Sequence, residues 1–399
     1  MSVYNIMDFG AVADGKTKNT EAIRKAIDAC HQAGGGKVLC GPGSFVTGSL
    51  VLKSNVELHL AAGCRILGST SLDDYEDFAA PGFIGTGDQV PEKSTQSLIR
   101  AVEAENIAIT GTGEINGSGL AFYDAGSADT TGKLSKPPTP RPRIGMFYKC
   151  RNVRFEDVSF IDSACWTLWL MKCREVNVHR VKISGNRRMR NNDGINIDSC
   201  RNVTVSDSFF DTEDDCLAVR AIQQMYDTPA VCENITVNNC VLESQCKGIL
   251  IGCPGDALIR NCTFSNLVIN NAAKGIAIEH PKCYLPEGNR GTADIHDIMF
   301  SNITINCSSG EPKNPIRVYV EEGVELKRLA NLSFSNIRIK SGGPCLVQGS
   351  RETTIQNVSF SNVEIETSGE DAIICRNCRD VKLTNVNLSN RPEPLPDGK

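Results

Sequence analysis

The chain has 399 residues, of which 40% are hydrophobic and 22% charged, and its formal net charge is −5. This mild negative charge gives no reason to expect nucleic acid or an anionic membrane surface as a partner, and no apolar run approaches the ~18–20 residues of a membrane span. The length suggests two or three domains. A solenoid, in which each coil contacts only its neighbours, can hold the same length in one domain.

The N-terminal region predicts a cap over one end of such a solenoid. Residues 19–30 place apolar side chains at helical spacing, with Asn19 or Thr20 as the N-cap. The glycines at 34–36 end this helix. We expect residues 1–40 to cover the open edge of the first coil.

Short strands and two long irregular segments follow. Strands are predicted at residues 4–10, 37–40, 48–52 and 55–60. Residues 71–97 and 119–143 are polar and irregular, and the second segment ends in KPPTPRPR. Because long loops on a rigid scaffold often shape binding sites, we expect both to border a cleft.

An internal repeat runs through the chain from about residue 100. It begins with Asn, Asp or Glu and continues with apolar residues in alternation, at intervals of about 23 to 36 residues between most copies. The copies include NIAITGTGEI, NVRFEDVSF, EVNVHRVKI, NVTVSDSFF, NITVNNCVL, DIMFSNITI, NLSFSNIRI, NVSFSNVEI and DVKLTNVNL. Such a period of β-prone residues, with Asn at the bends, predicts a parallel β-helix. The competing two-sheet sandwich would need hairpin turns every eight to twelve residues, which the sequence lacks.

Eighteen cysteines occur in a chain whose first residues carry neither a basic nor an apolar leader segment. We therefore expect free thiols in a cytoplasmic protein, most of them packed as small apolar residues inside the coils. Cys375 and Cys378 have a metal-like spacing, but no second pair stands at zinc-finger distance.

The segment from Asn191 to Arg220 holds three acids, Asp193, Asp214 and Asp215, around a predicted strand. If the chain closes one coil between Asp193 and Asp214, the acids lie on strands about 4.8 Å apart. Carboxylates that close cannot all ionise at ordinary pKa values, so one keeps its proton near neutrality. A held proton beside a free carboxylate suits the hydrolysis of a glycosidic bond.

These motifs together resemble glycoside hydrolase family 28, the polygalacturonase-type right-handed parallel β-helices of the pectate-lyase superfamily. The resemblance covers most of the chain and is carried by DFGAVADG, GTGEINGSG, the segment RPRIGMFYKCRNVRFEDVSFIDSACWTLWL, Asn191-Asn192-Asp193-Gly194 and Asp214-Asp215-Cys216. It implies one all-β domain over residues 1–399 with a short N-terminal helix. It also implies cleavage with inversion, in which Asp214 is the general acid and Asp193 and Asp215 hold and activate water. No metal or organic cofactor is expected.

Two departures from the family pattern bear on the substrate. Cys246 stands where the family has the His of a Gly-His-Gly stretch, and Ala277 and Glu279 stand where it has the Arg and Lys that grip the galacturonate carboxylate. At ~4 Å a unit charge pair is worth on the order of 4 kcal/mol at an effective dielectric near 20. We therefore expect a neutral sugar, such as rhamnose or galactose, at the cleaved position, with Glu279 accepting hydrogen bonds from its hydroxyl groups.

Further substrate-binding candidates surround the acids. Asn191 is expected to position Asp193, and Lys247 offers a local cation. The remaining candidates are Arg188 on the cleft rim, Arg220 after the acid pair, Cys246 and His280. Either Cys246 or His280 could take over the role of the family's missing His. Of the two tryptophans, Trp166 is expected in packing and Trp169 against a sugar face.

The sequence thus predicts an inverting, exo-acting hydrolase of plant cell-wall, pectin-type oligosaccharides. Two alternatives remain: a β-helix polysaccharide lyase or epimerase, and a non-catalytic carbohydrate-binding solenoid. The loss of the two cations argues against the lyase, and the three acids argue against the binder. The sequence carries no signal that separates a monomer from a homo-oligomer.

Overall fold

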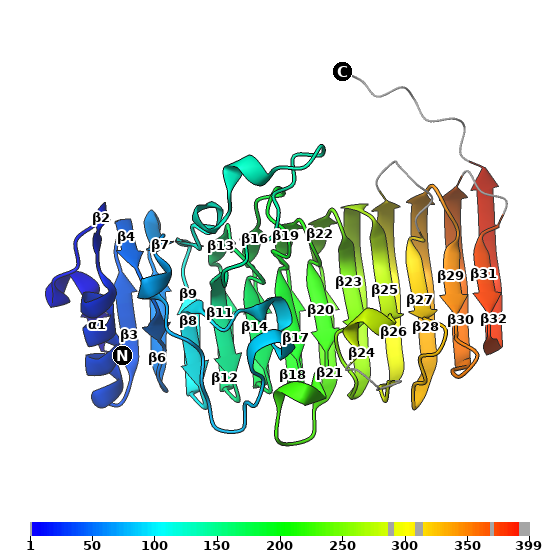
Figure 1. Cartoon of the computed structure of the whole chain (residues 1–399), viewed down its shortest axis with the longest axis horizontal. Helices are drawn as coiled ribbons and strands as arrows, with labels where there is room; N and C mark the ends of the chain where they lie inside the picture. Colours follow the sequence, from blue (N-terminus) through cyan, green and yellow to red (C-terminus); the bar gives the residue numbers. More distant parts are fainter. Residues whose placement is uncertain (1, 286–290, 308–313, 368–370, 391–399) are drawn as a thin grey trace.

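The computed structural model describes residues 2–285, 291–307, 314–367 and 371–390. The chain winds into a long solenoid whose strands run across its long axis (Figure 1). Among the described residues, the pairings between named strands are parallel, and the strands form one sheet of 21 strands and one of 11. The predicted all-β parallel β-helix with one short helix is therefore confirmed. The ends of the predicted 1–399 domain, Met1 and residues 391–399, lie outside the described residues.

In the N-terminal half, the strands of successive coils form three stacks. The first stack comprises β1 (Val3–Asn5), β3 (Gly36–Cys40), β6 (Val56–Leu60), β9 (Glu105–Thr110), β12 (Arg151–Glu156), β15 (Arg174–His179), β18 (Arg201–Ser206) and β21 (Val231–Asn238). The second comprises β2 (Asp14–Lys18), β4 (Gly43–Thr47), β7 (Cys64–Gly68), β10 (Glu114–Asn116), β13 (Ser159–Ile161), β16 (Lys182–Ser184), β19 (Phe209–Thr212) and β22 (Val241–Ser244).

These two stacks merge in the C-terminal half, because β21 and β22 both pair with the single long strand β24. The long strands are β24 (Leu258–Ala272), β26 (Asp294–Cys307), β28 (Arg328–Ser341), β30 (Ile355–Thr367) and β32 (Cys378–Asn390). The third stack is the 11-stranded sheet, with β5 (Leu50–Val51), β8 (Ser97–Val102), β11 (Arg143–Tyr148), β14 (Leu168–Met171), β17 (Ile195–Asp198), β20 (Leu217–Arg220), β23 (Lys247–Gly252), β25 (Lys274–His280), β27 (Ile316–Val320), β29 (Cys345–Gln348) and β31 (Ile373–Arg376).

The N-terminal helix α1 (Thr20–Gln32) covers the first coil, as predicted (Figure 1). Asn19 precedes it but does not cap it, because its side chain hydrogen-bonds Val12 and Thr17 instead. The strand predicted at 4–10 is only partly formed, since β1 ends at Asn5 and a short 3₁₀ helix, η1 (Ile6–Phe9), follows. The helices of the described part of the chain include none with the length and apolar character to span a bilayer.

The repeat predicted from the sequence is built from left-handed bends. The first residue of each copy has a positive φ, for example Asn202 (57°) and Asn331 (57°). Asn and Asp tolerate this conformation better than other non-glycine residues. Side-chain amides then bond from coil to coil, as where Asn234 Nδ2 donates to Asn202 Oδ1 at 2.9 Å. The coil-to-coil amide ladder fixes the position of each bend relative to the next.

Side chains that point inward form one continuous core. Phe264, Phe300, Phe334 and Phe360 stack ring on ring with centroids 4.7–5.1 Å apart. Thirteen of the eighteen cysteines are buried and all are free thiols, which confirms their predicted role as small packing residues. This close-packed interior holds the coils rigidly and leaves their outer faces to carry the polar groups.

Candidate active site

Three carboxylates meet on the outside of the third stack. Asp193 stands just before β17, and Asp214 and Asp215 occupy the turn between β19 and β20. The Gly194 N–H donates to the Asp215 carbonyl at 2.9 Å, and β17 and β20 pair in register. The chain therefore closes one coil between Asp193 and the acid pair, and this winding brings the three side chains together.

The two coils approach so closely here that Gly194 has no room for a side chain. A Cβ at this position would lie 2.3 Å from the Cys216 carbonyl oxygen. Such contact distances do not occur between unstrained atoms, so a larger residue would force the coils apart. Gly194 thus keeps Asp193 within reach of the acids on the next coil.

Two cations hold the acids in place. Arg220 Nη2 lies 3.3 Å from Asp193 Oδ2 and 3.4 Å from Asp215 Oδ2, and Lys247 Nζ lies 3.1 Å from Asp215 Oδ1. Arg220 also donates to Asn196 Oδ1 at 2.7 Å and to the Cys253 carbonyl. Arg220, predicted to contact the substrate, lines the cavity with a side chain that is 3% exposed, and these bonds hold it against the acids.

Burial and mutual repulsion change the acid–base properties of the group. Burial raises the pKa of Asp193 well above its ordinary value, and the charges of Asp214 and Asp215 raise it further against the pull of Arg220. Burial also raises the pKa of Asp215, which Lys247 partly opposes. The three acids therefore hold at least one proton where isolated carboxyl groups would be fully ionised.

Asp214 differs from its two neighbours in its partners. Its Oδ2 accepts a hydrogen bond from Asn191 Nδ2 at 3.1 Å, and its Oδ1 accepts one from the Asp215 N–H at 3.0 Å. Both donors are neutral, whereas Asp193 and Asp215 each contact a cation. Asn191, predicted to position Asp193, instead holds Asp214.

Cys246 completes the group on the next coil. Ligand atoms of Asp214, Asp215 and Cys246 all lie within 4.8 Å of one another, a spacing that a metal ion could bridge. The Lys247 ammonium already contacts Asp215 and lies 3.4 Å from Cys246 Sγ. Burial, followed by the charges of Asp214 and Asp215, raises the pKa of the Cys246 thiol well above its usual value, so Cys246 is a protonated neighbour and a poor nucleophile.

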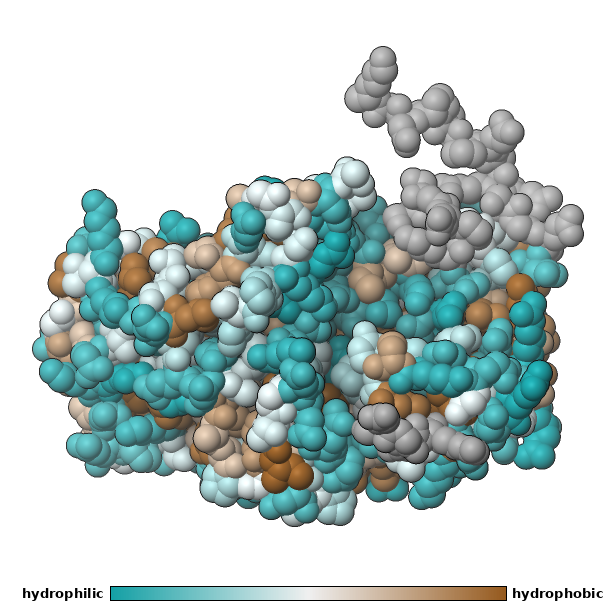
Figure 2. Space-filling model, viewed as in Figure 1, coloured by the Kyte–Doolittle hydropathy of each residue, from teal (hydrophilic) through white to brown (hydrophobic). Residues whose placement is uncertain are grey.

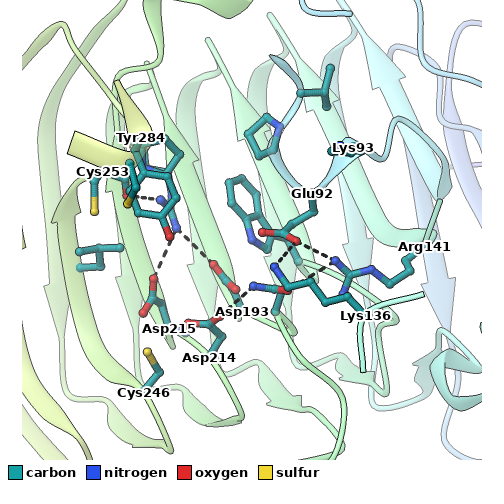
Figure 3. A pocket seen from close by; sticks show the side chains of 18 of the residues that line it. Glu92, Lys93, Lys136, Arg141, Asp193, Asp214, Asp215, Cys246, Cys253 and Tyr284 are labelled. Atoms are coloured by element: carbon teal, nitrogen blue, oxygen red, sulfur yellow. Dashed lines mark hydrogen bonds and ion pairs between the residues drawn. The ribbon is translucent and has the colours of Figure 1, made fainter. Parts of the chain in front are cut away.

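The acids line a cavity of about 1380 Å³, and hydrophilic side chains gather over the middle of this face (Figure 2). One wall consists of the two segments that the sequence predicted to border a cleft. Glu92 joins them, with its Oε2 2.7 Å from Arg141 Nη2 and 2.9 Å from Lys136 Nζ. Figure 3 shows this ion-paired group facing the cavity that the acids line.

A second ion-paired group borders the cavity. Glu279 Oε1 lies 2.6 Å from Lys274 Nζ and 2.8 Å from Arg317 Nε. Glu279 and Lys274 line the cavity. Ala277 is fully buried between them on the same strand. Glu279 is therefore not the unpaired negative charge on which the predicted repulsion of galacturonate depends, because Lys274 and Arg317 neutralise it.

Three sequence-based placements are corrected by the structure. His280 is buried beside Gly252 and is not among the residues that line the cavity, and burial lowers its pKa to about 4. Arg188 is not a lining residue either; its Nε donates to the Gly132 carbonyl at 3.2 Å and so tethers the 119–143 segment. Trp169 is fully buried, while Trp166 lines the cavity beneath Arg220, whose guanidinium carbon lies 4.5 Å from its ring centroid.

Other lining residues were missed from the sequence. They include the loop residues Glu92, Lys136, Arg141 and Tyr284, together with Lys274. Lys274 pairs in register with Lys247, so the strand alignment alone could have located it. The four loop residues follow no repeat and gave no comparable signal.

Comparisons with known proteins agree with this geometry. The family model for glycosyl hydrolases family 28 matches residues 82–384. A probable polygalacturonase of Vitis vinifera is 28% identical over 221 residues, covering 54% of this chain and 44% of that protein. An exo-poly-alpha-D-galacturonosidase of Dickeya chrysanthemi is 28% identical over 256 residues, covering 54% of this chain and 41% of that protein.

The chain thus spans less than half the length of these two curated relatives. Among solved structures, a hyperthermoactive exopolygalacturonase from Thermotoga maritima superposes with a TM-score of 0.78 at 22% identity. That match covers 97% of this chain and 91% of the other. At this identity the likeness concerns the fold, which extends over nearly the whole of both chains.

Proposed function

The chain belongs to glycosyl hydrolases family 28, and from that premise we propose that it hydrolyses a glycosidic bond of a pectin-type plant cell-wall oligosaccharide with inversion. The observation that carries the proposal is the unequal pairing of the three acids. Lys247 and Arg220 both contact Asp215, Arg220 contacts Asp193, and neutral groups bond Asp214.

This pairing supports a division of labour. Two adjacent cations favour the ionised form of Asp215, so this carboxylate suits the activation of water. Asp193, which shares Arg220 with it, suits the holding of that water. Asp214 is the least buried of the three acids, lines the cavity and, among the described residues, contacts no cation, so we assign to it the donation of a proton to the glycosidic oxygen. Water attack and proton donation in one step give a product of inverted anomeric configuration.

We propose that cleavage proceeds from a chain end. The support is the wall that residues 88–93 and 136–141 form along one side of the cavity. Glu92 joins both segments through Arg141 and Lys136, and Arg141 further donates to Tyr123 Oη at 2.7 Å. A wall held by several ion pairs and hydrogen bonds would stop an oligosaccharide from continuing past the site.

We propose that the cleaved sugar is neutral. The support is no longer repulsion by Glu279 but the state of the cations around the acids. Arg220 and Lys247 pair with Asp193 and Asp215, and Lys274 and Arg317 pair with Glu279. A substrate carboxylate would have to displace a carboxylate of the protein from each of these cations.

We also propose a cytoplasmic location, on the support of the eighteen free thiols. Cys375 is exposed and shares a hydrogen bond with the Cys378 thiol. Neighbouring thiols of this kind stay reduced in a cytosolic redox environment and oxidise in a secretory one. An enzyme so placed would act on imported oligosaccharides.

The test is Asp214→Asn on a panel of aryl glycosides and pectin-derived oligosaccharides. We expect the variant to lose activity by about 100-fold or more, because a general acid contributes 10²–10⁴-fold. The matched control is Asp211→Asn, a half-exposed acid that pairs with Arg187 at 2.8 Å and does not line the cavity. Its activity should stay within about twofold of the parent.

Product analysis completes this test. We expect single sugars released from the chain end, with the inverted anomer visible by NMR during the first minutes. Full activity of Asp214→Asn would remove the proposal. An unsaturated product absorbing in the ultraviolet would point to a lyase instead, and binding of oligosaccharides without turnover would point to a carbohydrate-binding solenoid.

A further inference from the structure

The carboxylate of Glu279, at the edge of the cavity, is contacted by two cations in the way that a bound anion would be. The Glu279 side chain is 9% exposed; its Oε1 accepts a hydrogen bond from Lys274 Nζ at 2.6 Å and lies 2.8 Å from Arg317 Nε in an ion pair. The three formal charges sum to +1. Two cations converging on one carboxylate oxygen, at the wall of a cavity, are the arrangement that proteins use to bind carboxylate ligands.

The two cations come from different coils, and Arg317 has contacts besides Glu279 that orient it. The Arg317 guanidinium carbon lies 4.1 Å from the centroid of the Tyr319 ring, and its Nη1 donates to Asn314 Oδ1 at 3.3 Å. Stacking and a hydrogen bond therefore orient this group even without its anion. How closely Lys274 and Glu279 approach each other depends on the residue between them on β25.

Ala277 is that intervening residue. It pairs in register with Arg317 on the next coil and stands between Lys274 and Glu279 on β25. Its small side chain is fully buried, and the Lys274 and Glu279 side chains on either side of it along the strand approach to 2.6 Å. A larger residue on this outer position would separate them, so the small side chain is part of the same arrangement.

We propose that Glu279 determines specificity by filling an anion site of the cavity with the protein's own carboxylate. The site formed by Lys274 and Arg317 fits the carboxylate of a uronic sugar or of a small monocarboxylate, and Glu279 excludes both. The inference rests on the proposed function, because Glu279 would select the substrate of that reaction. The anion site itself is independent of catalysis. Removal of Glu279 opens the site and turns a preference for neutral sugars into one for acidic sugars.

Calorimetry with sodium formate tests the site without any turnover. Wild-type protein, Glu279→Ala and Glu279→Gln are titrated at pH 7 and low salt. The Ala variant leaves both cations and an empty volume, so its affinity for formate should exceed that of the wild type by at least tenfold. Glu279→Gln keeps the shape and loses the charge, so it controls for folding and should bind formate more weakly than Glu279→Ala. The double variant Glu279→Ala/Lys274→Met should lose the gained affinity.

The same proteins are titrated with free galacturonate and with galactose, which differ in the carboxylate. We expect the ratio of the two affinities to rise at least tenfold in Glu279→Ala, and excess formate to reverse that rise. Unchanged formate affinity in a folded Glu279→Ala, or an unchanged sugar ratio, would overturn the proposal. Neither readout involves cleavage. Full activity of the Asp214→Asn variant would therefore contradict the proposed hydrolase function, whereas the anion site is decided by the formate and sugar titrations alone.

Discussion

Lys247 is the residue that most clearly separates the behaviour of the three acids. Its Nζ lies 3.1 Å from Asp215 Oδ1 and 3.4 Å from Cys246 Sγ. Burial alone would lower the pKa of Lys247, but Asp215, Cys246 and Asp214 outweigh it and raise this pKa well above the ordinary value. Lys247 therefore stays charged throughout the range in which the acids titrate.

Lys247→Met should move the acidic limb of the kcat/KM profile to higher pH. Burial already raises the pKa of Asp215, and Lys247 is the largest influence that lowers it. Losing the cation raises the pKa further, and a base that must be ionised then loses activity at a higher pH. The expected shift is roughly one pH unit or more, since an opposite charge at this range is worth 1–3 units.

The control for this experiment is Lys247→Arg, which keeps the charge and should keep the limb within about half a unit. At a pH well above the limb, the activity of Lys247→Met should approach that of the parent. A profile that is scaled down equally at every pH would contradict the assignment, because it would mean that Lys247 only supports the local packing.

The identities of the acids could be predicted at this scale, but their partners could not. Asp193, Asp214 and Asp215 belong to short motifs whose spacing equals one coil, so periodicity alone brings them together. The ion pair from Glu279 to Arg317 crosses 38 positions of the chain, including residues outside the described ranges. Coil lengths vary in this region, and the pairing depends on a strand register between coils that no sequence motif indicates.

At the scale of elements, the strands and bends followed from the repeat, whereas the segments at 71–97 and 119–143 did not. Both contain 3₁₀ turns, among them η4 (Pro91–Lys93) and η5 (Gly119–Phe122). Glu92 and Lys93 in the first segment have φ values of 58° and 51°. Consecutive left-handed residues of this kind are held by surrounding contacts rather than by local preference. The wall of the cavity therefore depends on tertiary ion pairs that a strand pattern does not encode.

The stacked phenylalanines offer a test of how the long strands are held. Phe334 is fully buried, with Phe300 and Phe360 at ring-centroid distances of 5.1 and 4.7 Å. Phe334→Ala should lower the free energy of unfolding by about 3–5 kcal/mol, the usual cost of a large-to-small change in a packed core. Urea denaturation followed by circular dichroism measures it.

Met299→Ala on β26 is the comparison, because Met299 is 52% exposed. A change at such a surface position normally stays within about 0.5 kcal/mol. If the two substitutions cost the same, the interior stack would not be what stabilises these coils.

At the scale of the whole molecule, different side chains of the solenoid provide stability and chemistry. Those inside the coils stabilise the fold, and those on the outer face form the candidate site. The interior ladder of apolar side chains is shared by every coil, and the candidate site occupies the outer face of β17, β20, β23 and β25 near the middle of the third stack (Figure 1). Because each coil rests on its neighbours, the site is supported from both sides. This division explains why the fold could be predicted from a repeating pattern while the substrate preference could not.

The number of reduced thiols can be predicted for the entire chain. All eighteen cysteines are free, two are exposed and three are partly exposed. In protein purified without a reductant, a thiol reagent should modify no more than these five before unfolding and all eighteen after denaturation. Cys375 should react first near neutrality, because its hydrogen bond with Cys378 lowers its pKa to about 7 and the thiolate is the reactive form. Mass spectrometry after brief labelling identifies that residue, and Cys375→Ser should abolish the fast phase. Fewer than eighteen thiols after denaturation would reveal disulfides and would contradict the proposed cytoplasmic location.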